Sequence, residues 1–227
     1  MAPKKHDAYL EIGEKRVFAG SVAWPGWCRS GRDEEAALQA LLDSGPRYAQ
    51  IVGTTDLGFE APEQISSFNI VERLDGNSTT DFGVPDMSLT RDKEPIESED
   101  LEHFQILLKA CWEAFDGAVK KAEEKELRKG PRGGGRDLGK IIDHVTGADE
   151  GYLRSIGWKI ENFREINPND RLTRIRDEIL EGFAAAARGE LPTEGPRGGK
   201  RWLPRYYVRR VAWHVIDHAW EIEDRIL

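Results

Sequence analysis

Apolar positions recur at spacings of three and four along the second half of the chain. This spacing places side chains on one face of an α-helix. The pattern runs through residues 98–129 and returns at about 137–156, 170–188 and 204–227, with Gly or Pro between the stretches. Four helices of this length with short breaks between them predict a four-helix bundle over residues 98–227.

The first half has a shorter and more mixed pattern, which is typical of strands. Ala8–Ile12 and Arg16–Val22 mix β-branched, aromatic and polar residues on either side of Gly13-Glu14-Lys15. Such a pattern predicts a β-hairpin. A further strand is predicted at Phe68–Leu74, and the Pro-Gly pair between Trp24 and Cys28 predicts a loop.

One helix is predicted among these strands, at residues 33–44. Acidic residues occupy its first turn, which suits the positive end of the helix dipole. Gly45 and Pro46 are predicted to end it. Its apolar side chains are expected to face the sheet; they are Leu38, Leu41 and Leu42.

The change of pattern divides the chain into two predicted domains, 1–90 and 98–227, within an α+β protein. Residues 84–100 hold two prolines and an acidic run, which is typical of a linker. The charge changes at the same place. Residues 1–100 carry 10 Lys and Arg against 19 Asp and Glu, a net charge of −9, and residues 101–227 carry 23 against 22, a net charge of +1.

Composition narrows the classes of function. The chain of 227 residues has no apolar run near the ~20 residues of a membrane span, and its first residues have no apolar core of a signal peptide. Only Cys28 and Cys111 are present, so we expect no disulfide framework and a cytoplasmic location. The acidic first half disfavours nucleic acid as a partner, because phosphate binding needs basic surfaces.

The candidate chemistry begins with the stretch RRVAWHVIDHAWEIEDR at 209–225. On a helix, His218 lies roughly 40° around and about 6 Å along from His214, so both imidazoles can reach one metal ion. Tyr207, Arg210 and Glu221 fall within roughly 60° of the same direction. Taken alone, such a pair of histidines is equally well explained by solvated or hydrogen-bonded side chains.

A third histidine strengthens the metal hypothesis. His144 stands in GKIIDHVTGADEGYL on the second helix of the predicted bundle, on a face made small by Gly147, Ala148 and Gly151. Small residues leave a hollow where an apolar core would place Leu or Phe. Three imidazoles at a hollow would leave coordination positions open, as in a catalytic metal site.

The other candidate ligands are explained more simply. His6 and His103 lack this setting, so we expect both at the surface. Cys111 lies on the apolar face of its helix, where packing in the core is the simpler role for its side chain.

The motif GKIIDHVTGADEGYL, followed some seventy residues later by VRRVAWHVIDHAWEIEDRI, resembles the DinB-like (DinB/YfiT) superfamily of four-helix bundles. The resemblance covers residues 98–227. It implies an up-down-down-up order of helices with a crossover near 157–169. It also implies a divalent metal bound by one histidine of the second helix and two of the fourth, which are His144, His214 and His218 here.

A second resemblance covers residues 8–53. The stretch FAGSVAWPGWCRSGRDEEAALQALLDS is similar to the strand, Pro-Gly loop and helix that open HicB-like antitoxin domains. The chain has no accompanying ribbon-helix-helix segment. A small α/β module that packs against the bundle is therefore an equally good interpretation.

These features predict a metal-dependent enzyme acting on a small molecule. The DinB-like resemblance implies either hydrolysis or transfer of a low-molecular-weight thiol. Zn, Ni and Fe all accept imidazole ligands, so the sequence leaves the identity of the divalent ion open. Glu221 is a candidate acid or base, or a group that orients a ligand, and Tyr207 and Arg210 are candidates for holding an anionic substrate. The competing hypothesis is a metal-stabilised scaffold whose first module binds a protein partner. The sequence leaves a homodimer open.

One short repeat remains. GPRGG occurs at 130–134 and again at 195–199, each time before a helix that bears histidine. Flexible basic loops suit helix connections, and this is the simpler interpretation. The alternative is that Arg132 or Arg197 closes over an anionic ligand.

Overall fold

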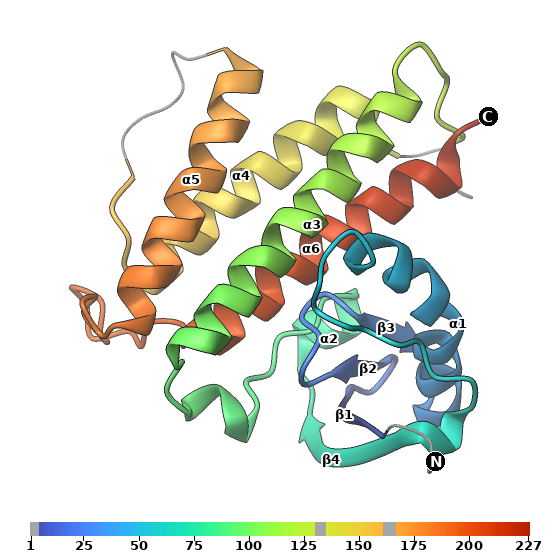
Figure 1. The fold of residues 1–227 in the computed structure, drawn as a ribbon, viewed down its shortest axis with the longest axis horizontal. Coiled ribbons are helices and arrows are strands. Elements are labelled where there is room, and N and C mark those ends of the chain that lie inside the picture. Colours follow the sequence, from blue (N-terminus) through green and yellow to red (C-terminus); the bar gives the residue numbers. More distant parts are fainter. Residues whose placement is uncertain (1–4, 130–134, 161–166) are drawn as a thin grey trace. The chain divides into compact units, whose positions relative to one another are not determined.

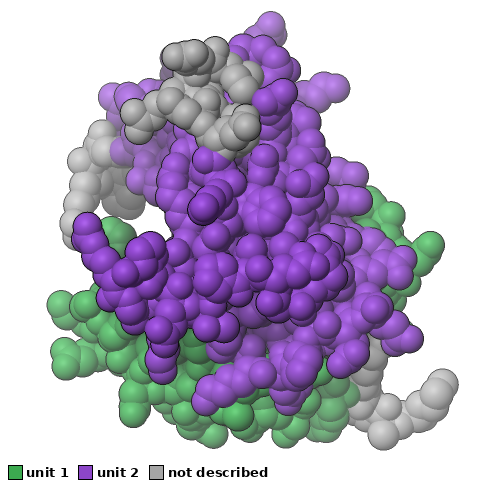
Figure 2. All heavy atoms as spheres, turned by 90° about the vertical axis from the view of Figure 1, so that its left-hand side faces the viewer, with its two compact units in different colours: residues 1–91 green, residues 92–227 purple. Residues whose placement is uncertain are grey.

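The computed structural model describes residues 5–129, 135–160 and 167–227. It is an α+β protein, and its chain forms two compact units, Met1–Arg91 and Asp92–Leu227 (Figure 2). The boundary between them falls inside the linker predicted at 84–100. The first copy of the GPRGG repeat, with Arg132, and residues 161–166 of the predicted crossover lie outside the described residues.

Unit 1 contains a four-stranded sheet in the order β3-β2-β1-β4. The strands are β1 (His6–Ile12), β2 (Val17–Ser21), β3 (Cys28–Gly31) and β4 (Phe68–Asp75). The predicted hairpin joins β1 and β2, and the Gly13 amide donates to the Arg16 carbonyl at 2.9 Å in its turn. The sequence did not predict β3, which is only four residues long and pairs antiparallel with β2. By contrast, β4 pairs parallel with β1.

Helix α1 (Glu34–Val52) packs on β2 and β3 (Figure 1). The predicted end at Gly45 and Pro46 is wrong, because the helix continues through both. Proline removes one backbone hydrogen bond there, but Tyr48, Ile51 and Val52 beyond it are buried and hold the last turns in place. Leu41 is buried as predicted, whereas Leu38 and Leu42 are only half-buried beside the stripe formed by Ala37, Leu41, Gly45, Tyr48 and Val52.

An aromatic cluster forms the core of unit 1. The Trp27 ring stacks on Tyr48 with centroids 5.9 Å apart, and Phe59 stands edge-on to both. His6 belongs to this cluster, with its ring 5.6 Å from that of Trp27. The prediction that His6 lies at the surface is therefore wrong. Its place at the start of β1, paired with Phe68, turns the imidazole into the core.

A buried carboxylate fixes the segment that follows β4. Glu11 of β1 is fully buried and accepts hydrogen bonds from the Thr80 hydroxyl and from the backbone amides of Asp86 and Met87. Thr80 belongs to α2 (Ser78–Phe82), one of three short helices that the sequence did not reveal. The other two are η1 (Ile65–Ser67) and η2 (Thr90–Lys93).

Unit 2 is built on four long helices (Figure 1). They are α3 (Ser98–Ala122), α4 (Leu138–Ile156), α5 (Pro168–Ala187) and α6 (Pro204–Arg225). In Figure 1, α3 and α6 run in one direction and α4 and α5 in the other. Within unit 2, α3 and α6 pack against each other most extensively, and α4 packs against both α5 and α6.

Helix α3 bears on two of the predictions. Helix α3 ends at Ala122, eight residues before the predicted break, because residues 123–126 are all charged and offer no apolar face to bury. The Cys111 side chain is fully buried on α3, as its place in the apolar pattern predicted.

Two arginines of α6 hold the segment before α3. Arg209 pairs with Asp92, and both side chains are at least nine-tenths buried. Arg205 pairs with Asp100 and donates to the Pro95 carbonyl at 2.6 Å. Within the described residues, no helix is both long and apolar enough to cross a membrane.

Candidate metal centre

Helices α4 and α6 bring three histidines together. His214 and His218 lie one turn apart on α6, and His144 lies on the adjacent α4. The centroid of the His144 ring is 5.1 Å from that of His214 and 4.9 Å from that of His218. The centroids of the two α6 rings are 4.6 Å apart. One ring nitrogen of each histidine lies within 4.8 Å of the others.

These separations fit one shared cation. Two ligands at ~2.0–2.2 Å from a tetrahedral ion stand roughly 3.3–3.6 Å apart. The Nε2 atoms of His144 and His214 are 3.2 Å apart. The third nitrogen lies within 4.8 Å of these two, so all three rings surround one point where a cation would fit.

The protonation state of the cluster also suits a metal. Burial lowers the pKa of His144 and, because His214 is more deeply enclosed, lowers the pKa of His214 much further. The neighbouring histidines and the positive charges of Arg210 and Arg136 act on His214 in the same direction. Metals bind the neutral imidazole, so these two rings are in the ligating form at neutral pH.

A carboxylate orients the third ring. Glu221 Oε2 lies 2.8 Å from His218 Nδ1, and its Oε1 accepts a hydrogen bond of 2.6 Å from Arg225. The hydrogen bond to His218 is the main cause that lowers the pKa of Glu221, which is therefore ionised. This contact leaves His218 Nε2 for a metal. Carboxylate–histidine pairs of this kind fix the ring and raise its basicity as a ligand.

Arg225 is the member of this arrangement that the sequence reasoning missed. Besides Glu221, it binds the backbone carbonyls of Arg128 and Arg136, both at 2.9 Å. It therefore ties the end of α6 to the segment that enters α4. The sequence could have predicted the contact between Arg225 and Glu221, since residues four apart on a helix bring their side chains together.

The predicted small face beside His144 borders open space. A Cβ atom added to Gly147 or to Gly151 would meet no heavy atom within 4 Å. Gly147 is exposed and Gly151 is half-buried. No other side chain packs against these two positions, and Gly147 faces solvent. The hollow predicted between the helices stays a prediction.

Aromatic side chains also lie beside the cluster. The ring of Tyr152, two turns after His144, lies 5.6 Å from that of His214, and the ring of Trp202 lies 5.2 Å from Tyr152. Arg210, predicted as a substrate-binding residue, has its guanidinium 5.6 Å from the Tyr152 ring and 5.1 Å from the Trp213 ring. Sequence reasoning missed Tyr152, which lies about 80° around the helix from His144.

Tyr207, the other residue predicted to hold substrate, lies in the core of unit 2. It is fully buried, and its ring stacks on Phe183 of α5 with centroids 6.3 Å apart. Its hydroxyl has no hydrogen-bond partner among the described residues. The same is true of both carboxyl oxygens of buried Asp149 on α4. Burial is the main cause that raises the pKa of Tyr207, and the ionised form of Asp149 acts in the same direction.

His103 lies apart from the cluster, on α3. It is half-buried rather than at the surface as predicted, and its ring stands edge-on to Phe104 with centroids 5.6 Å apart.

Comparison of the chain with protein-family models, with curated proteins and with solved structures finds no match. The chemistry of the site therefore has to be argued from its own residues.

Proposed function

We propose that the protein is a divalent-metal-dependent enzyme of the DinB-like type, with His144, His214 and His218 as ligands. The observation that carries this proposal is the convergence of one ring nitrogen from each histidine within 4.8 Å. The parallel course of α3 and α6, opposite to α4 and α5, is what an up-down-down-up bundle requires (Figure 1). The sheet and helix of unit 1 are likewise compatible with a HicB-like module.

The residues present favour a catalytic site over a purely structural one. A divalent ion held by three neutral imidazoles keeps its full charge and supplies Lewis-acid chemistry, acidifying a bound water or thiol or polarising a carbonyl. The cluster provides three protein ligands, and the acidic group nearest to them, Glu221, is already bound to His218 and Arg225. Of the three rings, His144 is the least buried, so a small molecule would reach the ion from its side.

Two reaction types fit this arrangement: hydrolysis, and transfer of a low-molecular-weight thiol to an electrophile. In both, this chain's residues have the same tasks. Glu221 holds His218 in one orientation, and Tyr152 with Arg210 forms one wall of the approach. Glu221 is better placed to orient His218 than to act as a free acid or base, because both of its oxygens are engaged.

Metal analysis of protein purified without a histidine tag tests the proposal. We expect about one divalent ion per chain in the wild type and a near-complete loss in the double variant His144→Ala/His218→Ala. His103→Ala is the matched control, because it removes a half-buried histidine of the same unit outside the cluster, and it should leave the metal content unchanged. Stoichiometric metal in the double variant would show that these histidines are not the ligands.

The catalytic site and the scaffold alternative differ in whether the bound ion accepts further ligands. An ion with open positions should exchange bound water and accept azide or a thiol as a further ligand, visible in the absorption spectrum of the Co²⁺-substituted protein. A tetrahedral spectrum that no added ligand perturbs would favour the scaffold.

A further inference from the structure

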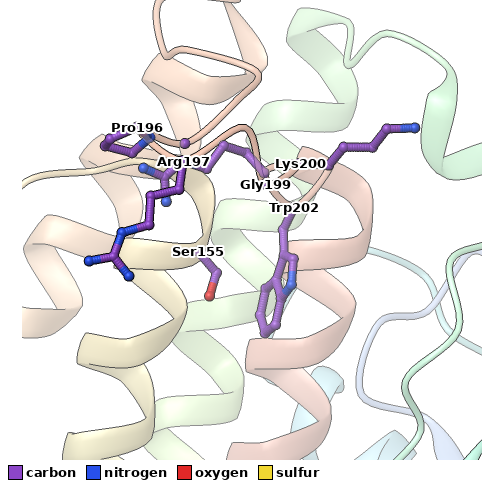
Figure 3. Close-up of a pocket in the computed structure, with 8 residues that line it drawn as sticks. Ser155, Pro196, Arg197, Gly199, Lys200 and Trp202 are labelled. Atoms are coloured by element: carbon purple, nitrogen blue, oxygen red, sulfur yellow. The ribbon is translucent and has the colours of Figure 1, made fainter.

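A cavity of about 520 Å³ lies where the segment between α5 and α6 meets the end of α4 (Figure 3). Among the described residues, three cationic and no acidic side chains line it. Its walls include Ser155, Pro196, Arg197, Lys200, Arg201 and Trp202. This size suits a small organic molecule, since ligand pockets commonly span ~300–1,000 Å³.

The segment that forms the cavity is folded, although the sequence suggested a flexible loop. The Gly195 amide donates to the Gly199 carbonyl at 2.7 Å, and the Gly198 amide donates to the Gly195 carbonyl at 2.9 Å. Gly198 has a φ of +76°, which a residue with a side chain rarely adopts. The second GPRGG copy is therefore a tight turn with a defined shape.

Two contacts anchor this turn to α4. Arg201 donates from Nη1 to the Arg154 carbonyl at 2.7 Å, and the Trp202 amide donates to the Ser155 carbonyl at 3.0 Å. Together they hold the cationic side chains beside the end of α4. The Nε atom of Arg201 is buried and has no partner among the described residues.

Two of the cationic side chains of the cavity have no ion-pair partner among the described residues. Neither Arg197 nor Lys200 forms an ion pair with any other described residue, whereas the nearby Arg188 pairs with Glu190 at 2.6 Å. Figure 3 shows Arg197 extending on the side of Ser155 and Lys200 extending away from it. Arg197 is therefore the cation best placed to meet a ligand, and Lys200 adds to the positive field at the opposite edge.

We propose that this cavity binds the oxyanion of a small organic molecule, a carboxylate or a phosphate, with its carbon skeleton against Trp202. A guanidinium matches either oxyanion with two parallel hydrogen bonds. The half-buried Trp202 ring favours an organic anion over a bare inorganic one, because it offers an apolar surface to cover. This inference does not depend on the metal centre.

Calorimetric titration at low salt tests the proposal, with phenyl phosphate and benzoate as probes and benzamide as their uncharged counterpart. We expect at least one of the anions to bind in a 1:1 ratio, benzamide not to bind, and inorganic phosphate and acetate to bind more weakly. The two anions distinguish phosphate from carboxylate recognition. Binding should weaken as salt rises, because the cations are exposed.

Matched variants locate the site. Arg197→Ala should weaken binding roughly tenfold or more, the usual loss for a charged hydrogen bond, and Lys200→Ala should weaken it less. Arg188→Ala, which removes an exposed arginine outside the cavity, should change nothing. His144→Ala/His218→Ala should retain anion binding, and Arg197→Ala should retain the metal, so the two proposals can fail separately.

Three results would overturn the proposal. The first is equal binding of benzamide and benzoate, and the second is unchanged binding in Arg197→Ala/Lys200→Ala. The third is binding of duplex DNA that depends on Arg197, while none of the small anions binds at a concentration on the order of 10 mM. That concentration is far above the dissociation constants of ordinary specific ligands.

Discussion

Among single residues, Glu221 has the clearest predicted effect on the metal centre. It joins His218 to Arg225, so Glu221→Ala should free the His218 ring to rotate and remove a negative charge from beside it. Loss of such a supporting carboxylate commonly lowers metal affinity by ~10–100-fold. Competition with a chelator of known affinity measures the change.

Glu223 supplies the matched control for Glu221. It lies two residues further along α6 and pairs with Lys121 at 3.1 Å. Glu223→Ala should leave metal affinity within about twofold of the wild type, because exposed ion pairs contribute little. Equal losses in the two variants would mean that Glu221 acts through the general charge of the helix and not through His218.

Asp149 gives a prediction about stability and pH. Burial raises the pKa of its carboxyl from 3.8 to about 8, against the opposing charge of Arg176. The folded protein then holds a proton that the unfolded chain releases above about pH 4. Its contribution to stability therefore falls as pH rises from about 4 to about 8.

Asp149→Asn removes this titration while keeping the shape of the side chain. Relative to the wild type, the variant should gain roughly 1–3 kcal/mol of stability between pH 6 and pH 9, since each pKa unit corresponds to about 1.4 kcal/mol. Urea unfolding at both pH values measures the gain. Asp143→Asn on the exposed face of α4 is the control and should show no such gain; a difference that is independent of pH would contradict the assignment.

Among the elements, α1 shows packing overriding a local stop signal. Gly45 and Pro46 would end a helix in isolation, yet α1 continues to Val52. The Leu42 carbonyl is left without its helical donor, because proline has no amide hydrogen. The buried side chains of the last two turns, Tyr48 and Ile51 among them, outweigh that loss.

Pro46→Ala should therefore stabilise α1. We expect a gain of about 1–2 kcal/mol: the restored hydrogen bond and relieved clash are partly offset by the greater freedom of the unfolded chain. Amide hydrogen exchange of the residues flanking position 46 measures this gain directly. Gln50→Ala, at another exposed position of α1, should give a much smaller change, and slower exchange in both variants alike would point to helix propensity instead.

At the scale of the whole molecule, the boundary between the units can be tested by truncation. A chain of residues 92–227 keeps the buried pair of Asp92 and Arg209, whereas a chain of residues 98–227 removes the Asp92 carboxylate from this pair. Removing one member of a buried pair typically destabilises a protein by about 3–5 kcal/mol. We expect the longer chain to be more stable by this order, measured by urea unfolding.

Full-length Asp92→Ala separates the ion pair from the rest of the removed segment. It should lose a similar amount of stability in unit 2, because it removes the same carboxylate from the Arg209 guanidinium. Both truncated chains should bind metal when folded, since all three histidines lie beyond residue 98. Equal stability of the two chains would show that the segment before α3 contributes nothing to unit 2.

The sequence alone determined the features that depend on neighbours a few residues away. Spacings of three and four predicted the four long helices, and the predicted hairpin turn at Gly13 formed between β1 and β2. The placement of His214 and His218 on one helix face followed from the same periodicity. Helical hydrogen bonds and side-chain contacts close within four residues, so the local pattern carries this information.

Only the tertiary structure decided what depends on distant segments. His144 meets the α6 histidines across seventy residues of chain because α4 packs on α6. His6 is buried, and α1 passes through Pro46, because aromatic and apolar neighbours elsewhere in unit 1 surround them. Burial and long-range packing set these outcomes, and no window of neighbouring residues contains the partners that decide them.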